Sequence, residues 1–136
     1  MKRSALVGMA VLASSCRAPE DALVSRCTTA MLSLSTECEV SAVRLVQPRS
    51  SYLDGNTKNF RIRLSATFSV QKGRVDVAIP ACVAGGEGRA EVTAERPASV
   101  SCDVALNRST FRFEVEAKPR DGGAEGFAGQ LTFKPI

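Results

Sequence analysis

The chain has 136 residues, which at roughly 100 to 200 residues per domain allows one folded domain and a short appendage. Lys and Arg number 18 and Asp and Glu 14, so the formal charge is +4, and without Lys2 and Arg3 it falls to +2. Nucleic-acid binders gather Lys and Arg on one face, so this balance predicts no nucleic-acid partner. The chain contains no His, the commonest general base and metal ligand, which disfavours most hydrolases and metalloenzymes.

Residues 1–15 have the composition of an export signal. Lys2 and Arg3 precede an apolar run from Ala5 to Ala13, and two serines follow it. Such a segment directs secretion and is then removed. Nine residues span about 13 Å as a helix, far less than the ~30 Å core of a bilayer. The run therefore predicts a cleaved signal peptide and not a transmembrane anchor.

The residues around Cys16, Leu12-Ala13-Ser14-Ser15-Cys16, resemble the lipobox of bacterial lipoproteins, with Leu one place earlier than in the commonest pattern. The resemblance covers only the leader and Cys16. It implies that the Cys16 thiol carries a diacylglyceryl group, that the chain is cut before Cys16, and that the new amine is acylated. It further implies a lipid-anchored protein of the bacterial cell envelope. Arg17 after the cysteine resembles the sorting pattern for the outer membrane.

Cysteine parity supports lipidation. The five cysteines are Cys16, Cys27, Cys38, Cys82 and Cys102. Lipidation consumes Cys16 and leaves an even number, as two disulfides in an oxidising compartment require. Pairing of sequence neighbours, Cys27–Cys38 and Cys82–Cys102, is favoured, and a Cys38–Cys102 bridge between two sheets stays open. Without lipidation the alternative is a soluble exported protein whose Cys16 is free or paired between chains.

Residues 16–30 are predicted to form the lipid anchor and a polar tether. Pro19, Glu20 and Asp21 suit the first turn of a helix, and Leu23 and Cys27 follow at near-helical spacing. A short helix is therefore a candidate here. The competing interpretation is a strand, because the apolar residues from 32 onward share one parity.

From about residue 31 the hydrophobic pattern has a period of two. Residues 59–70 alternate apolar and polar side chains without a break, which predicts a strand with one solvated face. A turn at 71–73 and renewed alternation at 75–79 predict that these two strands form a hairpin. Further strands are expected at 31–46, 89–95, 99–106, 110–118 and 126–134, with a loop at 47–56.

The phenylalanines fall in pairs on the apolar side of their predicted strands: Phe60 and Phe68, Phe111 and Phe113, Phe127 and Phe133. About seven short antiparallel strands, each with one apolar face, must bury that face against a second sheet. Residues 31–136 are therefore predicted to form an all-β, antiparallel β-sandwich of immunoglobulin-like type, with a small barrel as the alternative.

No catalytic constellation emerges from the sequence. A nucleophile needs a positioned base, and without His only Lys or a carboxylate remains. Glu114 and Glu116 share an outward face, as do two other Glu pairs, and arginines such as Arg61, Arg63 and Arg112 are available to offset them or to form a cationic stripe. A hydrolase or lyase that uses Glu114 and Glu116 is the third hypothesis, after the lipoprotein and the soluble exported protein.

The cysteine spacings contain no C-x-x-C, so neither a zinc site nor a thioredoxin-type motif is expected, and no cofactor is predicted. Asp54-Gly55-Asn56 is interpreted as a turn because the other ligands of a calcium loop are missing. The sequence thus predicts a non-catalytic binding or structural module, with an unidentified ligand or envelope protein as its partner.

Overall fold

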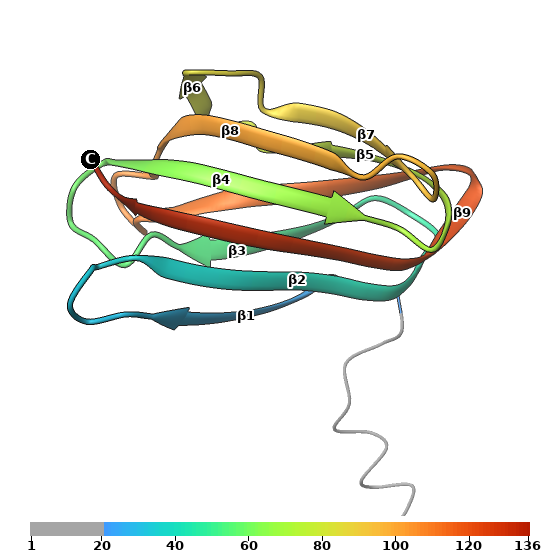
Figure 1. Ribbon diagram of the computed structural model, residues 1–136, viewed down its shortest axis with the longest axis horizontal. Helices are drawn as coiled ribbons and strands as arrows, with labels where there is room; N and C mark the ends of the chain where they lie inside the picture. Colours follow the sequence, from blue (N-terminus) through green and yellow to red (C-terminus); the bar gives the residue numbers. More distant parts are fainter. Residues whose placement is uncertain (1–20) are drawn as a thin grey trace, which may run out of the picture.

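The structure is a computed structural model, and it describes residues 21–136 (Figure 1). The predicted signal peptide, Cys16 and the first part of the tether lie outside the described residues. The described part is all-β and contains no helix. Its strands are β1 (Val24–Thr29), β2 (Thr36–Leu45), β3 (Arg49–Asp54), β4 (Arg61–Ser69), β5 (Lys72–Ala78), β6 (Cys82–Ala84), β7 (Arg89–Thr93), β8 (Ala98–Ala105) and β9 (Arg112–Pro135). All pairings between them are antiparallel.

The long strand β9 belongs to two layers. Its first part, 112–120, pairs with β3 and β5, and its last part, from 124 onward, pairs with β2 and β4. One layer has the order β1-β2-β9-β4-β8-β6, and the other has β3-β9-β5-β7. The chain bends between them at Asp121, Gly122 and Gly123, whose φ angles are 53°, 92° and 119°. Gly122 and Gly123 adopt their positive φ values without a Cβ clash, and Asp is among the few other residues that are enriched in this region.

One core lies between the layers, and the alternation expected from the sequence is confirmed in β4. Ile62, Leu64, Ala66 and Phe68 are each at most 2% exposed, while the residues between them face solvent. The ring of Phe68 stacks on Phe127 from β9, with centroids 5.9 Å apart. The antiparallel two-layer sandwich is therefore held by side chains that the period-two pattern identifies.

The hairpin predicted from 59–70 and 75–79 is wrong. Strand β4 pairs with β8 and β9, whereas β5 pairs with β7 and β9, so the chain crosses from one layer to the other. The buried Val70 closes the end of the core, and Gln71 N donates to Glu125 O over 3.0 Å. At Gly73 a Cβ would lie 2.6 Å from Gly123 O. The crossing thus depends on close backbone contact that a turn signal alone does not reveal.

The short helix predicted within residues 16–30 is wrong for the described part of that range, because Val24–Thr29 form the edge strand β1. The sandwich therefore begins before residue 31. Strand β2 is shorter than the predicted 31–46, because residues 31–33 form a turn. The predicted loop at 47–56 contains β3. Its inward position 51 is a serine, 7% exposed, which weakens the apolar alternation there.

The disulfides pair sequence neighbours, as the sequence favoured. Cys27 and Cys38 stand directly opposite each other on β1 and β2, and Cys82 on β6 is bonded to Cys102 on β8. Cys38 and Cys102 lie in the same layer, so the open alternative of a bridge between the sheets is not formed.

Candidate functional site

The strongest candidate for a binding site lies at one end of the layer β3-β9-β5-β7, beside the connections that follow β5 and β8. A hollow of about 510 Å³ opens there, which we call the Tyr52 pocket. It is lined by Tyr52, Pro80, Ala81, Ala105, Leu106, Asn107, Thr110, Arg112, Phe113 and Glu114. A second hollow of about 340 Å³ follows further along β9, lined by residues that include Asp76, Arg89, Glu116 and Lys118. The Tyr52 pocket combines apolar and polar side chains, whereas the second hollow is lined mainly by charged ones.

Strand register places the polar side chains of the Tyr52 pocket. Tyr52 of β3 stands opposite Glu114 of β9, and Asp54 stands opposite Arg112. Successive outward positions of a strand are two residues apart, so Arg112, Glu114 and Glu116 point to the same side of the sheet. Tyr52 is 61% exposed, which leaves its ring available as a contact surface beside these charges.

Glu114 is held as an acceptor by its neighbours on β3. Ser50 Oγ donates to Glu114 Oε2 over 2.6 Å, and Tyr52 Oη donates to the same oxygen over 3.5 Å. Glu116 has a different partner, because its Oε1 lies 3.4 Å from Lys118 Nζ. Glu114 and Glu116, the carboxylates of the hydrolase or lyase hypothesis, thus lie on one face of the sheet, and each has a different polar neighbour.

Arg112 is the exposed cation of the Tyr52 pocket. Its cross-strand neighbour Asp54 accepts from the backbone N–H of Asn56 over 2.8 Å. Within residues 21–136 no ion pair engages the Arg112 guanidinium. A planar guanidinium can bind a carboxylate or phosphate through two parallel hydrogen bonds. The pocket therefore offers an anion-binding group next to an aromatic ring.

The cationic stripe considered from the sequence is not assembled. Arg61 and Arg63 belong to β4, in the layer opposite the one that carries Arg112. Arg63 Nε is paired with Asp103 Oδ1 at 3.2 Å. On the outer face of the Arg112 layer, Arg120 bridges two carboxylates, 3.6 Å from Asp76 and 3.0 Å from Glu91. Much of the charge on this sheet is thus neutralised locally.

Asp21 attaches the start of the described chain to the sandwich. Its carboxylate accepts from the guanidinium of Arg49 and, over 3.5 Å, from Gln47 Nε2. The hydrogen bond from Arg49 holds the pKa of Asp21 below its ordinary value. The chain therefore joins the domain at the end of the sandwich where β3 begins, next to the bend of β9.

The sequence missed Tyr52 as a site residue because residues 47–56 were interpreted as a loop. The sequence signal for strand β3 is weak, because the inward position 51 is a serine and only Leu53 is apolar beside the exposed Tyr52. In the described part of the chain, no group of three or more His, Cys, Asp or Glu side chains is placed to hold a metal ion. Across residues 21–136 no helix has the length and apolar character needed to cross a membrane.

No family model and no curated protein matches the sequence. Among solved structures, the chain is similar to an HTH_3 family transcriptional regulator from Vibrio cholerae, with 14% identity, a TM-score of 0.42, and coverage of 92% of this chain and 59% of that one. A cupin domain from Schizosaccharomyces pombe has 10% identity, a TM-score of 0.37, and coverage of 84% and 64%. The chain spans less than two thirds of both.

A disulfide-linked pilus protein of Bacillus endospore appendages has 14% identity, a TM-score of 0.37, and coverage of 89% of this chain and 96% of that one. These similarities assign no activity or partner to the chain. The functional argument therefore rests on its own residues.

Proposed function

We propose that the chain is a lipid-anchored protein of the bacterial cell envelope, attached through Cys16 and sorted to the outer membrane, with a folded domain that acts as a non-catalytic binding module. The observation that carries the proposal is the cysteine count. Two disulfides engage four of the five cysteines, so Cys16 alone remains, and it is the residue of the lipobox-like segment. Disulfides also favour an exported, oxidising location, and two or three acyl chains anchor a protein stably.

The binding site in this proposal is the Tyr52 pocket. Its volume suits a small ligand or one unit of a larger one. Arg112 would bind a carboxylate or phosphate of the ligand, and Tyr52 would contact an apolar or ring face. An acidic sugar unit, which has a ring and a carboxylate, meets both requirements.

For the fold type, the strand order supports a jelly roll over the immunoglobulin-like arrangement. The core layers β2-β9-β4-β8 and β3-β9-β5-β7 contain eight strand segments when the two parts of β9 are counted separately, as in double-sheet jelly rolls. In immunoglobulin domains the second and fifth strands are neighbours in one sheet. Here β2 and β5 lie in different layers, so we propose the jelly roll.

The test is the intact mass of the native protein, extracted from membranes with detergent and alkylated without reduction. The proposal expects residues 16–136 plus two or three acyl chains, with no thiol alkylated. The matched variant is Cys16→Ser, which should lose the lipid mass while retaining both disulfides. A native mass without lipid, with one thiol alkylated or the chain dimerised, would instead establish the soluble exported protein.

A further inference from the structure

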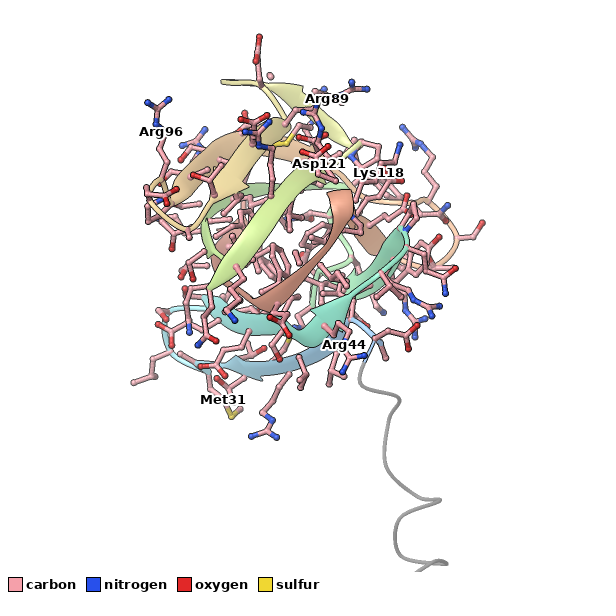
Figure 2. All side chains as sticks on the ribbon, turned by 90° about the vertical axis from the view of Figure 1, so that its right-hand side faces the viewer. Met31, Arg44, Arg89, Arg96, Lys118 and Asp121 are labelled. Carbon is pink, nitrogen blue, oxygen red and sulfur yellow. A yellow bond between two sulfur atoms is a disulfide. The ribbon has the colours of Figure 1, made fainter. Side chains whose placement is uncertain are left out.

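The turn between β1 and β2 exposes large apolar side chains. Met31 is 88% exposed, Leu32 is 103% exposed and Leu34 is 59% exposed, and we call these three residues the apolar tip. Single exposed apolar residues are common on protein surfaces, but a contiguous group marks an interaction site. In Figure 2 the side chain of Met31 projects away from the ribbon beside β1 and β2.

The backbone holds this turn in a defined shape. Ala30 N donates to Ser35 O over 2.8 Å, and Leu34 N donates to Ala30 O over 2.9 Å. Leu34 has a φ of 57°, in the left-handed region that residues other than glycine seldom adopt. The apolar side chains are therefore directed outward by a closed, hydrogen-bonded turn.

The base of the turn is fixed to the next connection at the same end of the sandwich. Asn56, between β3 and β4, donates from Nδ2 to Thr29 Oγ1 over 3.1 Å and to Thr36 Oγ1 over 3.3 Å. Thr29 and Thr36 are the residues at which β1 ends and β2 begins. The apolar tip is thus part of the surface formed by this end of the domain.

That end carries more cations than anions. Lys58, Arg61, Arg108 and Lys134 lie on its connections and strand termini, and within the described residues none of them forms an ion pair. The nearby acids are Glu37 and Asp54. Arg108 lies 4.6 Å above the ring of Phe60, which is 40% exposed and stacked on Phe111. The apolar tip thus lies at an end of the domain that also carries these cations and an exposed aromatic ring.

We propose that the apolar tip inserts into an anionic lipid bilayer, with the surrounding cations placed at the headgroups. Interfacial binding scales with the apolar area inserted and with attraction to anionic lipids, and this end supplies both. Lys and Arg side chains extend their charged ends toward headgroups while their stems remain apolar. A bilayer with anionic headgroups therefore matches both the exposed apolar side chains and the excess of cations at this end.

A second copy of the chain is the less suitable occupant. Three side chains at a turn bury far less than the roughly 1,200 Å² of a specific protein interface. Tip-to-tip contact would also bring the cations of both copies together. The inference does not depend on a lipid at Cys16, because the tip lies at the end of the sandwich opposite the one where the described chain begins (Figure 1).

The test uses the full chain carrying Cys16→Ser, so that no lipid on the chain contributes. Flotation is measured with vesicles of phosphatidylcholine and with vesicles of phosphatidylcholine and phosphatidylglycerol in equal parts. We expect flotation with the anionic vesicles, weakened by salt. Leu32→Ser should lower the partition coefficient roughly tenfold, as the loss of one inserted leucine side chain implies. The matched control is Val43→Ser, because Val43 is 68% exposed on β2 outside the tip and its loss should change nothing.

Leu32 is fully exposed, so circular dichroism and the thermal midpoint should be unchanged in Leu32→Ser, and any change in flotation reports binding. The proposal is overturned if the Cys16→Ser chain does not float with anionic vesicles, or if Leu32→Ser and Val43→Ser weaken flotation equally. It is also overturned if sedimentation shows a dimer that Leu32→Ser dissociates, because the tip then binds a second copy. Each of these results leaves the lipidation of Cys16 unaffected, since that is measured by mass on the native protein.

Discussion

Gly129 of β9 is the position where a single methyl group should disturb the core most clearly. A Cβ built there would lie 2.5 and 2.6 Å from two ring carbons of Phe68 and 2.8 Å from Cγ2 of Val40. Both side chains are at most 1% exposed, and Phe68 is already stacked on Phe127. Neither neighbour has free space into which to move. We therefore expect Gly129→Ala to lower the free energy of unfolding by about 1–3 kcal/mol, as overpacking does in other cores.

Urea unfolding followed by far-UV circular dichroism measures the loss, and a double-mutant cycle tests its cause. Phe68→Leu alone should cost about 1–2 kcal/mol for lost apolar burial. In the double variant the clash is relieved, so the combined loss should be smaller than the sum by more than ~0.5 kcal/mol, the level at which neighbours couple. Ala128→Gly, at the adjacent outward position, is the control for β9. Additive losses in the cycle would refute the assignment of the strain to Phe68.

Three further outcomes are expected. Replacing Cys82 and Cys102 by Ser should lower the free energy of unfolding by about 3 kcal/mol, from the loop-entropy relation for their separation of 20 residues. Because the folded pKa of Asp21 is lowered from 3.8, its pairing with Arg49 stabilises the fold above the unfolded pKa and is lost as pH falls through the folded value. The pKa of the Asp21 carboxyl, measured by NMR titration, should be higher in Arg49→Gln than in the unchanged protein. D-glucuronate should shift the NMR signals of the Tyr52 pocket, glucose should not, and Arg112→Gln should abolish the shift.

The sequence predicted the strands that have one apolar and one polar face, and it missed those that do not. β4 and β8 were found because each alternates between the core and solvent. All six residues of β1 are exposed, so no apolar period exists there, and the strand is held by its pairing and by Cys27–Cys38. Such edge strands depend on partners that are distant in the sequence, and local pattern cannot reveal them.

Connectivity was less predictable than strand location. The turn at 71–73 has the residues of a hairpin, yet the chain crosses between layers there, because Val70 and Val75 are both buried in the shared core. The strands predicted at 110–118 and 126–134 are one continuous strand, which bends at the Asp-Gly-Gly segment 121–123. In both cases the turn residues are compatible with two topologies, and packing between the layers determines which one forms.

The site was predictable only in part for a related reason. The alternation that identifies the core also places Glu114 and Glu116 on an outward face, as the structure has them. What the sequence could not supply is the neighbouring strand. Tyr52 and Ser50 reach Glu114 across 62 and 64 residues of chain, and Tyr52 joins the pocket because β3 pairs with β9.

The geometry of the domain restricts how the two proposed membrane contacts could act together. From Cys16 to Asp21 the chain can extend at most about 17 Å, and Asp21 is bound to Arg49 at one end of the sandwich. The apolar tip follows β1 at the other end, beyond the 10 residues of β2, which span about 33 Å. The tip and a lipid on Cys16 could therefore enter the same bilayer only if the strands lie along its surface. If the strands instead stand upright, the tip faces away from the anchoring membrane and is available to a second one.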